Sequence, residues 1–414
     1  MSASAREVVE QVDAAHRECW STVLASTVRL TRDLDLAEDC TQDAFVQALR
    51  TWPDGIPRNP GGWLTTVARR LALDRLRRET NLRRKLPLLI EEPSAGEDDE
   101  QPTDPLRLVF TCCHPALARQ AQVALTLRLI CGLSTPEVAA GLLISEPTAA
   151  ARITRAKKKI AAAGIPYRIP ADEELPARLD VVLTVVHLVY TAGHVAAGPD
   201  LTRADLTGRA IELARMLVRL MPAEPEPQAL LGLLLMTQAR GDARLSDDGE
   251  LVLLADQDRT RWDARMLAEG VARATGALRR GQGRFALQAA VAGLHVTAPS
   301  WEKTDWHQVV RMYDAMLLSW PSPIVALNRA AAHSLVPGAD LAAVLAELDA
   351  LGNEPALRSY AYLPAARADV LARLDRADEA AAAYDEAVAL TANEAEQRFL
   401  RRRRNALPVA AAGD

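Results

Sequence analysis

The sequence predicts an all-α protein. Aromatic residues make up only 4% of the 414 residues, while alanine and leucine are abundant, and this composition favours helices over strands. Apolar residues recur at helical spacing between segments that are broken by proline and glycine. A chain of this length exceeds one compact core, so we expect about two or three domains.

Charge is segregated along the chain. The net charge is −5, but residues 58–85 carry nine basic and two acidic side chains, and residues 148–159 carry five basic side chains and no acid. Residues 91–104 carry seven acids and no base. Two basic stripes joined by an acidic connector are compatible with nucleic-acid binding despite the negative total.

The first helical part is expected over residues 1–85. Asp35 to Glu38 has the spacing of a capping box with Asp35 in the cap position, and an apolar stripe follows on one face of that helix. A second helix starts at Asn59-Pro60, where asparagine caps and proline takes the first helical position, and runs to about Arg84. Residues 86–104 then have the composition of a linker.

Residues 105–165 are expected to hold a helix-turn-helix. Ser134-Thr135-Pro136-Glu137 combines cap hydroxyls, an early proline and a capping-box glutamate, and Ser145 can cap the following helix. That second helix would lie in a major groove, where arginines pair with guanine edges and terminal lysines meet phosphates. An ordinary helical hairpin with a solvated basic end is the alternative.

Residues 175–414 are expected to form a helical solenoid or bundle. Residues 365–390 place their apolar side chains like one tetratricopeptide (TPR) unit, with Asp375 where such units usually carry the glycine of the turn. The spacing to the preceding segment is irregular, so the part is TPR-like rather than a regular array. A dense polar block, Asp256-Gln257-Asp258-Arg259, lies between two of its helices and could cap or cross-link them.

No cofactor or metal site is expected. Cys112, Cys113 and His114, with Cys131 downstream, lack C-x₂-C spacing, and adjacent cysteines rarely both bind one tetrahedral ion, so a packed core is favoured over zinc. No apolar run is long enough to span a bilayer, and the N-terminus lacks the order of a signal peptide, so we expect a cytoplasmic protein.

The order of these parts resembles a known family. Asp33 to Phe45 and Pro60 to Arg78 are similar to region two of the extracytoplasmic-function (ECF) sigma factors of the sigma-70 superfamily. Leu133 to Ile160 resembles their region four, with Leu143 in place of the usual glycine and Ala150 where a basic residue often stands. Phe110 to Leu117 and the long C-terminus resemble the subgroup with a TPR-like extension.

The resemblance implies a role for each part. Region two would dock on the β′ clamp helices of core RNA polymerase, region four would act beside the β subunit flap, and the acidic linker would thread the RNA path instead of being a disordered spacer. The residues implicated in core binding are Glu38, Asp39, Gln42, Asp43 and Phe45. Those implicated at the −10 element are Trp63, Arg69, Arg70, Arg77 and Arg78, although Trp63 is equally suited to the core. Those implicated at the −35 element are Thr148, Ala151, Arg152, Arg155, Lys157, Lys158 and Lys159.

The sequence therefore predicts a sigma factor, which is not an enzyme, with a C-terminal extension that modulates its activity and contacts the sigma regions or the polymerase. Two other classes stay open. A stand-alone helix-turn-helix regulator would bind operators without the acidic surface of region two. A hydrolase or metalloenzyme would use Cys112, Cys113 and His114, although no motif supplies a base and an orienting group around a thiol.

Overall fold

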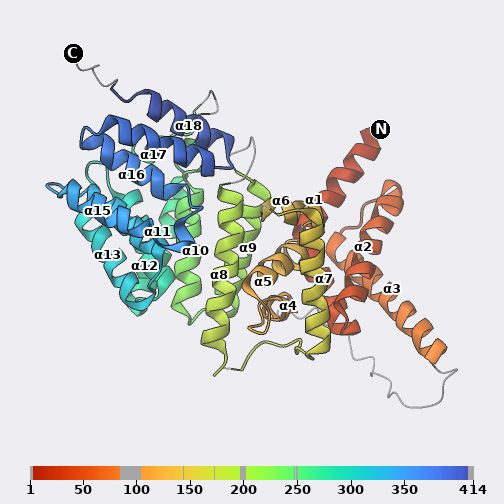
Figure 1. Ribbon diagram of the computed structural model, residues 1–414. Helices are drawn as coiled ribbons and strands as arrows, with labels where there is room; N and C mark the ends of the chain where they lie inside the picture. The colour runs from red at the N-terminus through yellow and green to blue at the C-terminus, as the bar shows by residue number, and fades with distance from the viewer. Residues whose placement is uncertain are drawn as a thin grey trace. The chain divides into compact units, whose positions relative to one another are not determined.

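The fold is helical, as predicted. The computed structural model describes residues 3–83, 104–142, 144–171, 173–195, 202–246, 248 and 250–408 (Figure 1). Within these residues there is no strand, and the only β-type pairing is an isolated bridge between Leu245 and Leu251. The chain divides into two compact units, residues 1–189 and 190–414.

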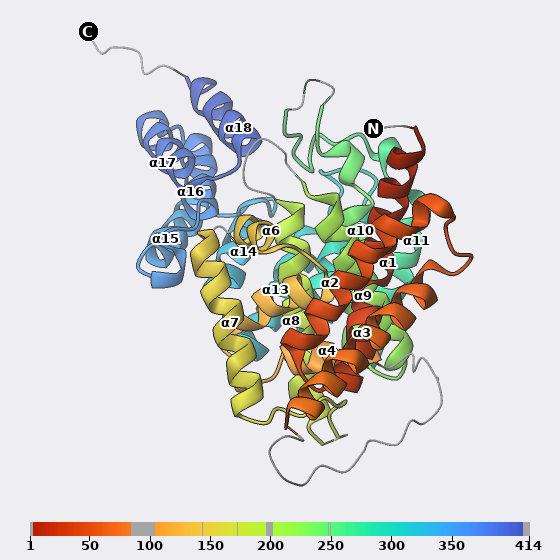
Figure 2. The ribbon, with the colours of Figure 1, turned by 90° about the vertical axis from the view of Figure 1, so that its right-hand side faces the viewer.

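The first unit contains a three-helix bundle followed by shorter helices. Its helices are α1 (Ala3–Thr31), α2 (Leu34–Thr51), η1 (Trp52–Asp54), α3 (Pro60–Arg83), α4 (Asp104–Cys112), α5 (Arg119–Leu125), η2 (Thr126–Ile130), α6 (Thr135–Gly141), α7 (Glu146–Ala162) and α8 (Leu175–His194), the last of which runs into the second unit. Figure 2 shows α1, α2 and α3 side by side, each in contact with the other two. The predicted acidic linker, apart from Asp104, lies outside the described residues.

Buried hydrogen bonds tie the bundle to the helices that follow it. The indole Nε1 of Trp20 in α1 donates to the carbonyl oxygen of Leu129 in η2 at 3.1 Å, and the hydroxyl of Tyr167 donates to the carbonyl oxygen of Ala25 at 2.9 Å. Because buried donors need partners, these two bonds fix how the parts meet. The first unit is one packed body rather than two independent parts.

One predicted helix start is wrong and another is confirmed. The cap of α2 is Asp33, not Asp35: its Oδ1 accepts the N–H groups of Asp35 and Leu36 at 2.8 and 3.0 Å, so the helix begins two residues earlier than the capping-box pattern indicated. Glu38 therefore does not take part in the cap of α2. α3 does begin at Pro60, where the side chain of Asn59 accepts the N–H of Gly62 at 3.0 Å.

The second unit is a row of helices. They are α9 (Ala204–Leu220), α10 (Pro225–Gln238), η3 (Gly241–Ala243), η4 (Arg259–Arg261), α11 (Ala264–Arg280), α12 (Arg284–Thr297), α13 (Trp306–Ser319), α14 (Pro323–Ser334), α15 (Leu341–Leu351), η5 (Pro355–Leu357), α16 (Tyr362–Arg373), α17 (Ala377–Leu390) and α18 (Glu394–Asn405). From α9 to α18 each α-helix contacts the next along the chain, and α10 also meets α12. Such neighbour-to-neighbour packing is the arrangement of a helical solenoid.

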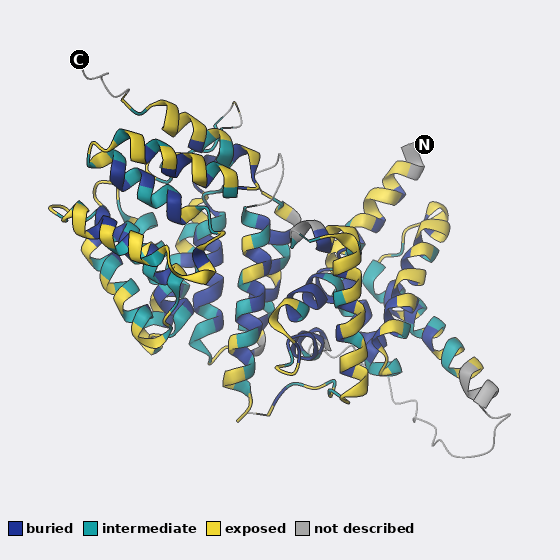
Figure 3. Cartoon of the chain, in the orientation of Figure 1, coloured by how far each residue is buried: buried dark blue, intermediate teal, exposed yellow. Residues whose placement is uncertain are grey.

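Two positions in the second unit depend on special backbone geometry. Gly232 of α10 and Gly270 of α11 face each other so closely that a Cβ on Gly232 would lie 2.8 Å from the Gly270 carbonyl oxygen. Asp375, between α16 and α17, has φ +56°, so an aspartate adopts the left-handed turn for which the TPR pattern uses glycine. Figure 3 shows the resulting contrast between α10, largely buried, and α18, largely exposed.

α8 differs from what the sequence indicated about membranes. By length and composition it is, among the described helices, the one that could cross a bilayer, although the core helix of a soluble protein passes the same test. Its Arg178 donates from Nη2 to the carbonyl oxygen of Phe110 at 2.6 Å, within the protein. The helix therefore gives only weak evidence for a membrane span.

Candidate functional site

α6 and α7 form the predicted helix-turn-helix, and both begin at the predicted caps. The Oε2 of Glu137 accepts the N–H of Ser134 at 2.7 Å, and Ser134 Oγ accepts the N–H of Glu137 at 3.4 Å, which completes a capping box. Ser145 caps α7 by accepting the N–H of Thr148 at 3.4 Å. These caps fix the angle at which α7 leaves the turn.

The outer face of α7 presents most of the residues predicted to meet DNA. Its buried face consists of Ala149, Ile153, Ala156 and Ile160. The side chains of Thr148, Ala151, Arg155, Lys158 and Lys159 are exposed, and Arg152 is half-buried. Arg155 is exposed, and its Nε donates to the carbonyl oxygen of Ala151 at 3.1 Å. This face is basic and can approach a polyanion.

The outer face of α2 is acidic. Asp39, Gln42 and Asp43 are exposed, whereas Phe45 is 6% exposed and packs on His16 and Trp20 of α1 with ring centroids 5.1 and 5.9 Å away. Phe45 thus holds α2 against α1 instead of lying on the surface with the predicted core-binding residues.

Glu38 and Lys157, predicted to bind different partners, are paired with each other. Lys157 Nζ of α7 lies 2.5 Å from Glu38 Oε2 and 2.7 Å from Asp35 Oδ1, and the other oxygen of Glu38 is paired with the guanidinium of Arg128. The Glu38 and Lys157 side chains are 6% and 11% exposed. Burial alone would lower the pKa of Lys157, but attraction to Glu38 and the hydrogen bonds that the ammonium donates to both carboxylates raise it, so the lysine stays charged.

Sequence reasoning missed Arg75 and Arg128. Arg75 of α3 lies 2.5 Å from Asp43 Oδ2 and 3.9 Å from Asp39 Oδ2, so the acidic face of α2 is partly neutralised by the next helix. The sequence showed an acidic helix followed by a basic one, but a single sequence does not show which of their charged residues come into contact.

α3 carries the residues predicted for the −10 element. Trp63 is half-buried, with its ring centroid 5.8 Å from that of the buried Trp52, so part of the indole belongs to the core. Arg70, Arg77 and Arg78 are exposed, and Arg69 is partly exposed. A half-exposed aromatic side chain beside several arginines suits a single strand, which offers base faces and phosphates together.

The cysteine cluster is packed as a core. Cys112, Cys113 and Cys131 are buried, Cys113 Sγ lies 3.7 Å from Thr126 Oγ1, and His114 Nδ1 accepts the N–H of Ala116 at 3.2 Å. Burial raises the pKa of the Cys113 thiol to about 12, against a smaller opposing effect of its Thr126 hydrogen bond. Such a thiol stays protonated and is a poor nucleophile or ligand. In the described part of the chain, no group of three or more metal-ligating residue types comes together.

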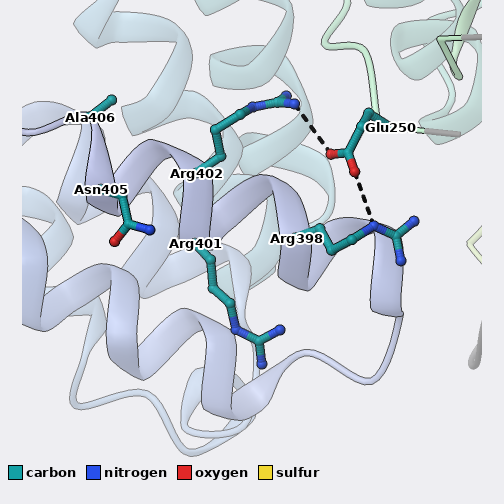
Figure 4. A pocket seen from close by; sticks show the side chains of 6 residues that line it. All are labelled: Glu250, Arg398, Arg401, Arg402, Asn405 and Ala406. Atoms are coloured by element: carbon teal, nitrogen blue, oxygen red, sulfur yellow. Dashed lines mark hydrogen bonds and ion pairs between the residues drawn. The ribbon is translucent and has the colours of Figure 1, made fainter. Parts of the chain in front are cut away.

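A pocket of about 580 Å³ lies on the second unit where α18 meets residue 250 (Figure 4). Its lining residues are Glu250, Arg398, Arg401, Arg402, Asn405 and Ala406. Glu250 accepts from Arg398 Nε at 3.1 Å and from Arg402 Nη1 at 3.2 Å, while Arg401 is directed away from it. Because Glu250 pairs with two of the three arginines, these ion pairs connect residue 250 to α18.

Three family models match parts of the chain. Residues 18–81 match the family described as sigma-70 region 2, residues 107–160 match sigma-70 region 4, and residues 178–278 match a family of unknown function, DUF6596. No solved structure matches.

Three relatives match different shares of the chain. An uncharacterised protein of Rhizobium meliloti is 40% identical over 405 residues, which is 94% of each chain. The ECF RNA polymerase sigma factor SigJ of Mycobacterium tuberculosis is 30% identical over 214 residues, 44% of this chain and 65% of that protein. The probable ECF RNA polymerase sigma factor SigI of the same species is 28% identical over 160 residues, 36% of this chain and 54% of that one.

A region 2 bundle followed by a region 4 helix-turn-helix defines a sigma-70-type transcription initiation factor. Within that class, the chain belongs to the extracytoplasmic-function sigma factors, and residues 178–278, at the start of its C-terminal extension, match the family of unknown function.

Proposed function

We propose that this chain binds core RNA polymerase and directs it to promoters that carry a −35 and a −10 element. In this proposal the exposed face of α2 (Asp39, Gln42 and Asp43) docks on the β′ clamp helices. The basic face of α7 reads the −35 element, beside the β subunit flap. The chain supplies recognition in the cytoplasm while the polymerase makes the bonds.

The observation that carries the proposal is the sequence of exposed surfaces in one chain. An acidic helix face is followed by α3 with exposed arginines, and then by a capped helix-turn-helix with an exposed Arg155. A DNA-binding protein acting alone needs only the last of these surfaces. The acidic face has a use when the partner is a protein surface of opposite charge.

The −10 contacts are proposed for the exposed arginines of α3 and for Trp63. Arg70, Arg77 and Arg78 can follow phosphates, and the open part of the Trp63 indole can stack on an unpaired base. Arg69 has a partner within the protein and contributes less readily. Glu38 and Lys157 act in this proposal by joining α2 to α7 in the free protein.

In vitro transcription with purified core polymerase and a promoter library tests the function. We expect promoter-specific transcripts with the full chain, and their loss in Asp39→Asn/Asp43→Asn with free-DNA binding unchanged. A stand-alone regulator would show the opposite: operator binding without polymerase, and no effect of the α2 variants on any activity. Absence of both transcript and core binding would overturn the proposal.

The C-terminal extension is proposed to modulate this activity. The arginines of its most basic helix, α18, are largely paired with acids of the same unit, Glu250, Asp369 and Asp385, and the resemblance of the chain as a whole includes this part. A truncation that tests it should end after His194, because α8 begins in the first unit and Arg178 bonds to Phe110 there. Unchanged transcription and core affinity in that truncation, with the first unit still folded, would refute a regulatory role.

A further inference from the structure

The polar block that sequence analysis singled out folds into a cluster with residues from two helices. Arg240 follows the end of α10, Arg259 and Trp262 lie in and after η4, and His295 is on α12. The N–H of Asp263 donates to the carbonyl oxygen of Ala239 at 2.9 Å, which holds the block beside Arg240. All of these residues belong to the second unit.

Arg259 connects the parts of the cluster. Its Nη1 donates to the backbone carbonyl oxygens of His295 and Ala298 at 3.0 and 2.8 Å. Its guanidinium carbon lies 4.5 Å from the centre of the Trp262 ring. One side of the guanidinium is therefore satisfied by α12, and its face is covered by an indole.

Several polar atoms of the cluster have no partner. Of the solvent-shielded nitrogens that lack a hydrogen bond in the described part of the chain, four belong to this cluster: Arg240 Nε, Arg259 Nη2, Trp262 Nε1 and His295 Nδ1. Three of the four can only donate. The Oε1 of Gln257, in the same polar block, is an acceptor without a partner. A buried donor without an acceptor lowers stability, so several in one cluster require an explanation such as a bound group.

The cluster also holds positive charge without enough negative charge. Burial, with the repulsion of Arg244 and Arg259, lowers the pKa of Arg240 to about 10. Burial, with the charges of Arg240 and Arg259, lowers the pKa of His295 to about 4. The charge of Glu302 acts on Arg259, but this carboxylate accepts its hydrogen bond from Ser300 at 2.6 Å. Asp258 accepts the N–H of Thr260 at 2.9 Å.

We propose that Arg240, Arg259, Trp262 and His295 form a binding site for an oxyanion, the phosphate or carboxylate group of a small ligand. Such a group supplies the acceptors and the negative charge that these four side chains lack. Guanidinium groups fit both kinds of oxyanion because two of their N–H bonds match two oxygens. The ligand would bind the extension itself, independently of DNA and polymerase.

Calorimetric titration of the full chain tests the site, with inorganic phosphate and malonate as probes in chloride buffer at constant ionic strength. We expect saturable binding of one probe molecule per chain. Preference for phosphate would assign a phosphoryl ligand, and preference for malonate a carboxylate ligand. Arg240→Met should weaken binding at least tenfold, whereas Arg358→Met, which removes an exposed arginine of the same unit, should leave it unchanged.

Stability without ligand separates a binding role from a structural one. Arg240→Met removes an unpaired buried cation, so the melting temperature of the ligand-free variant should equal or exceed that of the parent chain. Trp262→Phe keeps a ring against Arg259 but removes the Nε1 donor, so it should also weaken binding. It serves as the second variant if Arg240→Met proves hard to purify. No saturable binding of either probe, or binding unaffected by both variants, would overturn the proposal.

Discussion

Replacing Glu38 with glutamine should destabilise the first unit far more than its position in an acidic helix suggests. Its carboxylate is 6% exposed and holds two cations, Lys157 at 2.5 Å and the guanidinium of Arg128. Removing one partner from a buried pair typically costs about 3–5 kcal/mol, because it leaves an uncompensated charge.

We expect Glu38→Gln to fall at the lower end of that range, about 3 kcal/mol. Lys157 keeps Asp35 at 2.7 Å, and Arg128 keeps its hydrogen bond to the carbonyl oxygen of Leu133 at 2.8 Å, so neither cation is left without a partner. Asp35 is a weaker substitute because 72% of its side chain is exposed. The attraction across that pair is screened by water.

The assay is urea unfolding of the full chain, followed by hydrogen exchange at amides of α2 and α7 so that the two units are not averaged together. Asp39→Asn is the matched control one position along, since its carboxylate is 69% exposed and lies 3.9 Å from Arg75. It should cost less than about 1 kcal/mol. A double-mutant cycle with Lys157→Met should show coupling of about 1–3 kcal/mol. Equal losses for Glu38→Gln and Asp39→Asn, or no coupling, would refute the reasoning.

Other consequences of the structure can be measured separately. The pKa of His295 is about 4 in the folded chain against an ordinary 6.5, so between these pH values the unfolded chain binds a proton that the folded chain does not. The contribution of His295 to stability is therefore complete above pH 6.5 and falls by about 3 kcal/mol toward pH 4. His295→Gln should flatten that slope in melting experiments without added anion. Gly132→Ala should cost more than about 1 kcal/mol of unfolding free energy, since Gly132 has φ +71° and a Cβ there would lie 2.9 Å from Trp20; no change would contradict this packing. Native Cys113 should resist iodoacetamide at pH 8 and react on unfolding in urea, and rapid native labelling would exclude the buried thiol. Arg155→Ala should weaken binding to −35 DNA about tenfold at fixed salt, whereas the affinity for core polymerase without DNA should be unchanged.

Sequence reasoning went furthest where a signal is local. The cap at Ser134 with Glu137, the cap at Ser145 and the start of α3 at Pro60 were all predicted, because a cap depends on residues within one turn of each other. The same logic failed at α2, where two aspartates two positions apart compete for the cap and the pattern favoured Asp35 over Asp33.

Contacts between distant segments were beyond the sequence. Lys157 is the first of three consecutive lysines, and of the three it is the one that reaches Glu38, because its position on α7 turns it toward α2. Similarly, the block from Asp256 to Arg259 was recognisable as unusual, but its relation to Arg240 and His295 required the fold.

By itself, therefore, the sequence determined the all-α class and the residues that cap the helix-turn-helix, since these follow from composition, periodicity and spacing within single turns. The order of region two, region four and extension came from the resemblance of its motifs to a known family. The tertiary structure decided which charged residues remain on the surface, which pair across helices, and which buried nitrogens are left without acceptors. Those outcomes depend on burial and on distances of a few ångströms between segments that are far apart in the chain, such as Glu38 and Lys157, which are 119 residues apart.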